Sequence, residues 1–413
     1  MIRPLVFQRE KIIKLLVYIF LTSMILKISL ASLLWAPRAF KFEDLLDNIY
    51  NVNENIFISQ FLTVLIFCSG ALNLFFILSK FKISEVSIKR YVYLYFMFYF
   101  LTLISALRSD VTINLEMIAV MFTPMILFSL LYYNIDIVGL FILTFTVILF
   151  VSLVSALVNP DWAYVLDYES DLAIFDKRFA GILSHPNVTG VVSIICIVFA
   201  LARKNSYVLF SLFVALCSLI MSQSKTNWLA CFFIITLYLT RGFLTKNFLI
   251  GIFLLIGIPF TLFPFIYLPL AQFLPDNQIF TLTGRVAIWE EALNYFNNYP
   301  FFGFGGNAWG VSFRELTELT GANHAHNQLL ETMSTQGIFG LLILLSLFGI
   351  LFKNFGENLS SEEGFIFSAF FFYIILRGVS EPSVSHNNVT IVLFVMLIVS
   401  YYGLLLQRNY NEK

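Results

Sequence analysis

Long apolar runs recur along this chain and leave little room for any fold other than a bundle of membrane-spanning helices. A helix needs about 20 apolar residues to cross the hydrocarbon core of a bilayer, and we count twelve runs of about that length. Charged residues make up 12% of the sequence, whereas soluble domains carry about 25%. The chain therefore cannot cover a water-facing surface, and we expect an all-α, polytopic integral membrane protein.

The expected spans divide the chain into short loops and one long polar interval. Residues 270–329 form a large extracytoplasmic loop between the ninth and tenth spans, and no soluble domain is evident, so we treat residues 1–413 as one domain. Four runs are short, which leaves a range of eleven to thirteen spans. The twelve expected spans are residues 12–36, 56–79, 91–107, 111–133, 135–158, 180–201, 206–222, 226–240, 247–269, 330–352, 364–379 and 388–407.

The distribution of charge predicts the orientation. Lys and Arg favour cytoplasmic loops. With the N-terminus in the cytoplasm, 15 of the 25 basic residues fall in inner segments, and the acidic residues between 161 and 176 face outward. An even number of spans then places both termini in the cytoplasm. The N-terminal run has no clear small-residue cleavage site, so we expect an uncleaved first span.

The same topology places all four histidines at the outer face, at positions 185, 324, 326 and 386. The net charge of zero argues against a nucleic-acid partner. Neither a Gly-rich phosphate loop nor a dinucleotide fingerprint is present, which argues against a nucleotide donor. The four cysteines match no metal or disulfide spacing and are expected to be buried hydrophobes.

The long polar interval, residues 276–340, holds the residues best suited to chemistry. Arg285 follows Thr283-Gly284, and an arginine offers a planar fork for phosphate oxygens. A surface ion pair with Glu290 or Glu291 is the alternative. Trp289 is expected to pack the loop onto the membrane face rather than to stack on a sugar.

The histidine pair in Asn-His-Ala-His-Asn, residues 323–327, carries the sharpest prediction. An imidazole with a pKa near 6.5 can take a proton from a hydroxyl at neutral pH, and we interpret His326 as a general base. A metal pair is one alternative, but the histidines lack a Cys or a third ligand, and Glu331 is the only carboxylate close in sequence. A structural loop histidine is the other.

Further polar groups interrupt the apolar runs. Arg178 precedes the break at Pro186-Asn187, and Lys225 lies in the turn Ser-Gln-Ser-Lys. Each is interpreted as facing an anionic ligand, with an interfacial anchor as the alternative for Arg178 and snorkelling for Lys225. Arg377, Glu381 and His386 in the last outer loop either complete that site, or Arg377 and Glu381 form a plain ion pair. The candidate substrate-binding residues are Arg178, Lys225, Arg314, His324, Asn327 and Arg377.

One combination of these motifs resembles the bacterial O-antigen ligase and O-antigen or capsule polymerase superfamily. The resemblance rests on Thr283-Gly284-Arg285 with Trp289 and on the Pro300 to Gly305 stretch. Its strongest part is His326-Asn327, followed by nine residues, Gly337, two residues and Gly340. These motifs span about 60 residues of the sequence, and the plan of spans with one late outer loop extends the likeness over the chain.

This resemblance implies a metal-independent, inverting glycosyl transfer without a cofactor, at the outer face of the bacterial inner membrane. The donor would be an oligosaccharide on undecaprenyl diphosphate, and the acceptor a lipid-linked repeat or lipid A–core. Arg285 would hold the diphosphate and His326 would activate the acceptor hydroxyl, which makes them the expected catalytic residues. Lys225 stands where the family has an arginine in a Ser-Arg turn, so it keeps the charge but loses the bidentate fork.

Three functions remain open at this stage. The preferred one is polymerisation of the repeat units of a surface polysaccharide. The second is ligation of the finished polymer to lipid A–core. The third is non-enzymatic transport of lipid-linked glycans, which would place charged residues along a central path or show inverted repeats. The expected spans are nearly free of charge apart from Lys27 and Glu116, which favours an enzyme.

Overall fold

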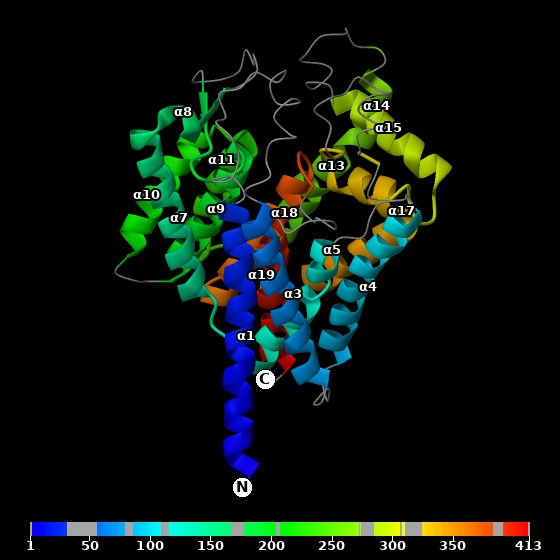
Figure 1. Ribbon diagram of the computed structural model, residues 1–413. Helices are drawn as coiled ribbons and strands as arrows, with labels where there is room; N and C mark the ends of the chain where they lie inside the picture. Colours follow the sequence, from blue (N-terminus) through cyan, green and yellow to red (C-terminus); the bar gives the residue numbers. More distant parts are fainter. Residues whose placement is uncertain are drawn as a thin grey trace.

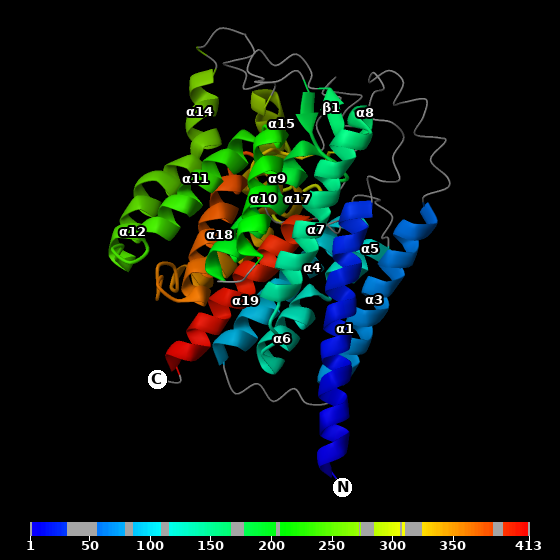
Figure 2. The same ribbon diagram turned by 90° about the vertical axis from the view of Figure 1, so that its left-hand side faces the viewer.

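The computed structural model is a mostly helical bundle, with both chain ends at the same end of the molecule (Figures 1 and 2). It describes residues 2–30, 56–78, 86–108, 115–166, 177–203, 207–271, 273, 285–305, 308–309, 324–382 and 391–411.

Each of the twelve expected spans overlaps a helix or a broken run of helices. The longer helices are α1 (Ile2–Leu30), α3 (Ile56–Leu78), α4 (Val86–Arg108), α7 (Val138–Val158), α17 (Gln328–Phe352) and α19 (Ile391–Asn411). The shorter ones are α5 (Leu115–Val120), α6 (Thr123–Tyr133), α8 (Pro160–Ala163), α9 (Pro186–Ala202), α10 (Val208–Ser222), α11 (Lys225–Thr240), α12 (Lys246–Ile252), the π-helical turn η3 (Phe253–Gly257), α13 (Ile258–Thr261), α14 (Phe263–Ala271), α15 (Arg285–Asn298) and α18 (Glu362–Gly378).

The length and apolar character of the helices support a membrane protein. Within the described part of the chain, five helical segments are long and apolar enough to cross a bilayer: Arg9–Ser29, Ile58–Ile77, Leu115–Tyr133, Val138–Val158 and Gln328–Phe352. The pair Lys246–Thr261 and Phe263–Ala271, bent by 44°, makes a sixth if it is counted as one span. Twelve spans therefore remain a prediction. So do the limits of the large loop, of which only 270–271, 273, 285–305, 308–309 and 324–329 are described.

The two charges expected inside spans neutralise each other. Lys27 Nζ lies 2.7 Å from a carboxylate oxygen of Glu116 and donates to the Thr63 hydroxyl at 2.5 Å. A charge in an apolar environment is costly unless it is paired. This pair therefore stabilises the contact between α1, α3 and α5.

A short antiparallel strand pair departs from the all-α prediction. Strand β1 (Tyr164–Leu166) pairs with β2 (Lys177–Phe179), with Val165 opposite Arg178. Each strand has three residues, which is too short for an alternating pattern to stand out in the sequence. The pair precedes α9, and Arg178 lies in β2.

Helix α17 is interrupted by a second chain segment. Gly337 has φ 65° and ψ −159° inside the helix, a conformation that is essentially restricted to glycine. At this break, the backbone N–H of Ile338 donates to the Pro300 carbonyl, and that of Phe304 donates to the Ser334 carbonyl, both at 2.7 Å. The turn-rich connector at 300–304 therefore fills the gap in α17 and holds its N-terminal part in place.

Glycine is required on both sides of this crossing. A Cβ on Gly337 would lie 2.5 Å from the Phe301 carbonyl carbon, and a Cβ on Gly303, where φ is 69°, would lie 2.4 Å from the Gln336 nitrogen. All these neighbours are backbone atoms, which cannot turn away as a side chain can. The glycine in the motif after His326 is thus explained by a close backbone approach.

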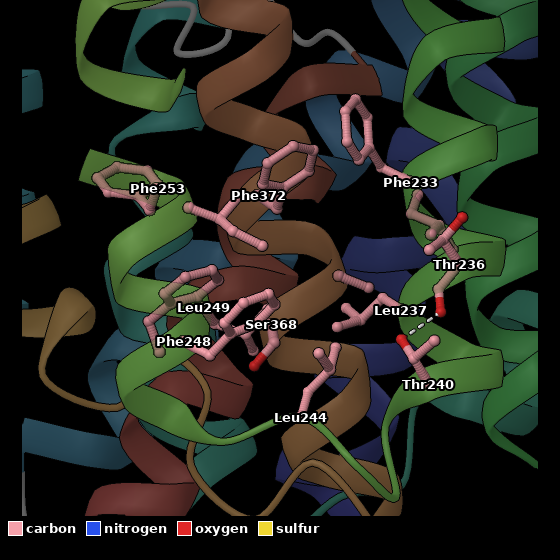
Figure 3. A pocket seen from close by; sticks show the side chains of 14 residues that line it. Phe233, Thr236, Leu237, Thr240, Leu244, Phe248, Leu249, Phe253, Ser368 and Phe372 are labelled. Carbon is pink, nitrogen blue, oxygen red and sulfur yellow. Dashed lines mark hydrogen bonds between the residues drawn. The ribbon is translucent and has the colours of Figure 1, made fainter. Parts of the chain in front are cut away.

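An apolar cavity of about 290 Å³ lies between α11, α12, η3 and α18 (Figure 3). Its wall is mostly Phe, Leu and Ile, and two of its hydroxyls take part in hydrogen bonds: Thr240 donates to the Thr236 carbonyl at 2.6 Å, and Ser368 accepts from the Gly356 N–H at 3.2 Å. The candidate site residues do not line it. This cavity can accommodate hydrocarbon but is separate from the polar groups described next.

Candidate active site

Five helix ends gather the candidate residues at one end of the bundle. They are the N-terminal ends of α9, α11, α15 and α17 and the C-terminal end of α18. This end lies away from both chain termini (Figure 2). Residues nearly 200 positions apart in the sequence, such as Asn187 and Glu381, are in contact here.

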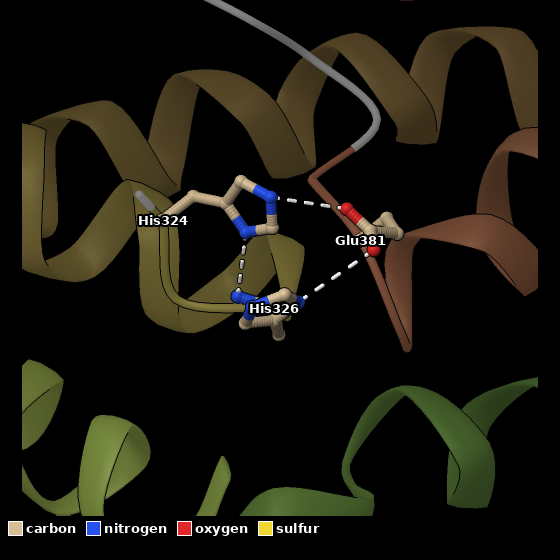
Figure 4. Close-up of side chains that lie close together, drawn as sticks. All are labelled: His324, His326 and Glu381. Atoms are coloured by element: carbon tan, nitrogen blue, oxygen red, sulfur yellow. Dashed lines mark hydrogen bonds and ion pairs between the residues drawn. The ribbon is translucent and has the colours of Figure 1, made fainter. Parts of the chain in front are cut away.

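Two histidines face a single carboxylate at the centre of this region (Figure 4). His324 Nε2 lies 3.1 Å from Glu381 Oε2, and His326 Nδ1 lies 3.6 Å from Glu381 Oε1. The ring centroids of the histidines are 4.1 Å apart. The carboxylate is mostly shielded from solvent, with 16% of its side chain exposed. The histidine pair predicted from the sequence therefore has a third partner, Glu381.

The turn that carries the histidines is held by hydrogen bonds on each side of His326. Trp289 Nε1 donates to the Ala325 carbonyl at 3.0 Å, and the Ala325 N–H donates to Glu331 at 2.7 Å. Asn327 caps α17 by accepting from the backbone N–H groups of Leu329 and Leu330, at 3.0 and 3.2 Å. Trp289 is 2% exposed and packs among apolar side chains of the protein, such as Leu268 and Leu330; its packing onto the membrane face stays a prediction.

His326 itself has a left-handed backbone conformation, with φ of 49°. Non-glycine residues rarely adopt it, and it is found at functional sites when surrounding contacts hold it there. Here the backbone N–H of His326 donates to His324 Nδ1 at 3.1 Å, and the cap at Asn327 fixes the next residue. The conformation turns the His326 ring toward Glu381.

Arg285 begins α15 and lies within electrostatic range of the same groups. Burial lowers the pKa of its guanidinium, and the Glu381 charge opposes that shift. An arginine nevertheless stays protonated in proteins, so the site contains a partly buried cation. Of its proposed surface partners, Glu290 is exposed and Glu291 accepts a hydrogen bond from Asn294 at 3.0 Å.

Asn187 connects Arg178 to the central carboxylate. Arg178 donates to Asn187 Oδ1 at 2.9 Å and to the Ser222 carbonyl at 3.2 Å. The amide nitrogen of Asn187 donates to Glu381 Oε1 at 3.3 Å. The break predicted at Pro186-Asn187 is real: α9 begins there, and the His185 side chain caps it by accepting from the Asn187 N–H at 3.1 Å.

The remaining cations lie around this centre. Arg377 is 8% exposed near the end of α18 and donates to the Pro382 carbonyl at 2.9 Å. Lys225 is exposed in the first turn of α11, beside Thr226, whose hydroxyl is 2.9 Å from that of Ser380. The predictions for Arg314 and His386, and for Thr283 and Gly284, lie outside the described residues.

Burial and charge assign the protonation states of the two central groups. Burial lowers the pKa of His326 below its usual value, against a smaller opposing effect of Glu381, and the charge of Arg285 adds to the lowering. Burial alone raises the pKa of Glu381, but its contacts with His324 and His326 and the charge of Arg377 outweigh this and leave the pKa well below its usual range. At neutral pH the site therefore pairs a neutral His326 with an ionised Glu381.

The three side chains are close enough together to suggest a metal site, since one ligand atom from each lies within 4.8 Å of the others. The hydrogen bonds argue against it. His324 Nδ1 accepts the backbone N–H of His326, so a neutral His324 carries its proton on Nε2. That nitrogen then donates to Glu381 and offers no lone pair to a metal.

The expectation that the two histidines lack a third ligand, with Glu331 as the only close carboxylate, is wrong. Glu331 is buried and accepts from the Ala325 backbone, whereas Glu381 meets both histidines. Glu381 lies 55 residues beyond His326 along the chain, and only the return of α18 to this end brings them together. The only sequence feature that pointed to Glu381 was its position after Arg377 in an expected outer loop.

Comparison with known proteins agrees with the predicted superfamily. No curated protein matches this chain. Residues 210–345 match the family model described as O-antigen ligase. The matched segment contains Lys225, Arg285, the histidine pair and Gly337, while Glu381 lies beyond it. This match supports the assignment of the chain to the O-antigen ligase/polymerase superfamily, as the His326 motif predicted.

Proposed function

We propose that this protein is a metal-independent, inverting glycosyltransferase of the outer face of the bacterial inner membrane. It transfers a glycan from undecaprenyl diphosphate to a sugar hydroxyl and thereby polymerises the repeat units of a surface polysaccharide. The observation that carries this proposal is the partly buried His326, which lies 3.6 Å from Glu381 and within electrostatic range of the Arg285 cation. A proton acceptor and an anion holder at one site are what this transfer requires.

The chemical step uses these two groups in different roles. His326 takes the proton of the acceptor hydroxyl while that oxygen bonds to the anomeric carbon of the donor sugar. The bond from that carbon to the diphosphate oxygen breaks, and the diphosphate leaves with the bonding electron pair. Arg285 stabilises the negative charge that develops on the leaving group. The donor bond supplies the driving force, so no nucleotide is consumed.

The surrounding cations extend the anion-binding region. Lys225 is exposed next to Thr226, whose hydroxyl contacts that of Ser380, and can reach a ligand at the surface of the site. Arg178 and Arg377 are held by protein acceptors and contribute positive potential from more buried positions. We assign the diphosphate to Arg285 and Lys225, with Arg178 and Arg377 in support and His324 and Asn327 shaping the histidine turn. The undescribed Arg314 stays a proposed substrate-binding residue.

The arrangement of charge favours this enzyme over a transporter. The Lys27 and Glu116 charges satisfy each other at 2.7 Å, and the candidate polar groups gather at one end of the bundle. A transport path would need such groups at successive depths.

The proposal is tested with His326→Ala. General-base catalysis contributes about 10²- to 10⁴-fold to a rate, so the purified variant should lose activity in that range on a lipid-linked oligosaccharide donor. Glu290→Ala, an exposed change on α15, is the control and should keep the wild-type rate. Full activity of His326→Ala, at equal amounts of membrane protein, would remove the general-base assignment.

Deletion of the gene separates polymerase from ligase. Gel analysis of the surface polysaccharide should show core carrying a single repeat if the protein is a polymerase, as we propose. Bare core together with accumulated lipid-linked polymer would instead identify a ligase. Reintroduction of the wild-type chain, but not of His326→Ala, should restore the normal pattern.

A further inference from the structure

We propose that Glu381 is a positioning residue that keeps His326 in the tautomer with its proton on Nδ1, leaving the Nε2 lone pair free to accept a proton. This inference deepens the proposed function, since it assigns the reactive nitrogen, and it rests on that function only for the identity of the proton donor. The orientation itself follows from the contacts around Glu381.

Glu381 is held in place by donors other than His326. His324 Nε2 lies at 3.1 Å from one oxygen, and the Asn187 amide nitrogen lies at 3.3 Å from the other. Asn187 cannot turn its oxygen toward Glu381 instead, because that oxygen accepts from Arg178 at 2.9 Å and from Ser224 at 3.2 Å. His324 and Asn187 therefore hold the Glu381 carboxylate in place independently of His326.

The two histidines of the motif have opposite proton arrangements. A backbone N–H is always a donor, so the bond from the His326 nitrogen to His324 Nδ1 requires a lone pair on that atom. The proton of a neutral His324 is then on Nε2, where it meets Glu381. His324 consequently holds the carboxylate and is not the base.

His326 presents its other nitrogen to the carboxylate. Its Nδ1 is buried, has no hydrogen bond within the described part of the chain, and lies 3.6 Å from Glu381 Oε1. A lone pair on Nδ1 would face the negative oxygen and be repelled, whereas a proton there is attracted. A closure of roughly 0.5 Å would bring the two atoms to ordinary hydrogen-bond distance. A neutral imidazole has one proton, so Nε2 is left unprotonated.

The charged groups around this pair come from α15, α18 and strand β2 and agree with that arrangement. Arg285 at the start of α15 and Arg377 near the end of α18 act on Glu381 and favour its ionised form. Arg178 reaches it only through Asn187. An ionised Glu381 is an acceptor at both oxygens, which is the state that the proton on His326 Nδ1 needs.

The tautomer can be read directly by NMR of protein labelled with ¹⁵N-histidine. The chain has only four histidines, and single His→Gln variants assign their signals. At a pH where His326 is neutral, the wild type should show a protonated Nδ1 and an unprotonated Nε2 at His326. Glu381→Ala should reduce the population of that tautomer, while Glu290→Ala should leave it unchanged.

If Glu381→Ala misfolds, the conservative variant Glu381→Gln still tests the positioning role. Glu381→Gln keeps the shape of the side chain but offers one acceptor oxygen to the donors that now share two, so it should also reduce the Nδ1–H tautomer. Both variants should lower kcat by at least ten-fold, toward the ~10⁴-fold known for loss of an orienting carboxylate, with a smaller change in KM.

The outcomes separate this inference from the proposed function. A wild-type His326 with its proton on Nε2, or a tautomer that is unchanged in both Glu381 variants, would overturn the positioning role even if glycan transfer is lost. The expected tautomer in a protein that transfers no glycan would support the positioning role and refute the proposed function.

Discussion

The crossing of two chain segments at Gly337 allows a quantitative prediction for Gly337→Ala. The native φ of 65° with ψ of −159° costs a residue with a Cβ about 1–3 kcal/mol. The new Cβ would also lie 2.5 Å from the Phe301 carbonyl carbon and 2.6 Å from the Gly303 nitrogen. Forcing an atom into such a space costs about 1–3 kcal/mol more. We therefore expect a loss of about 2–6 kcal/mol in the free energy of unfolding.

The matched control is Gly349→Ala in the same helix. A Cβ there meets no atom within 4 Å, and alanine is the better helix former by about 1 kcal/mol. Unfolding of both purified variants by a denaturing detergent, followed by circular dichroism, gives the two changes in free energy. A loss of less than about 0.5 kcal/mol in Gly337→Ala relative to wild type would contradict the close approach of the two backbone segments at Gly337.

Three further predictions concern the site. Because burial depresses the pKa of His326, kcat/KM should stay level near pH 7 and fall only as acid protonates the base, at a pH below 6.5; an acid limb above that value contradicts the assignment. Asn327→Ala should cost about 0.5–2 kcal/mol of stability through loss of the α17 cap, and Asn327→Asp should retain most of it in the same denaturation assay. Arg285→Ala should abolish transfer and Arg285→Lys restore part of it, whereas normal rates in both exclude a diphosphate role.

Much of the helical plan could be predicted because it depends on local sequence. Apolar runs of sufficient length specify helices wherever the chain runs through lipid, and all twelve expected spans coincide with helical segments. The histidine turn was visible as a short motif for the same reason, whereas the capping role of Asn327 was not predicted. The break in α17 was not predicted: the expected span 330–352 runs through Gly337, and the segment at 300–304 that fills the gap lies outside that span.

The parts that could not be predicted depend on contacts distant in sequence. No local pattern marks Glu381 as the partner of His324 and His326, and none reveals that Asn187 connects Arg178 to it. The β1–β2 pair is too short to show a period. From the sequence, Arg178 was expected to face an anionic ligand. In the structure its guanidinium donates to two protein acceptors, the Ser222 carbonyl and the Asn187 side chain.

The order in which the parts of the site are synthesised gives the Glu381 contact a consequence for biogenesis. Both histidines precede α17, while the carboxylate follows α18. During synthesis and membrane insertion, the His326 imidazole therefore lacks its Glu381 contact until α18 has been made. In the proposed mechanism, a polypeptide released after α17 would therefore carry the histidine turn but lack the carboxylate that orients His326.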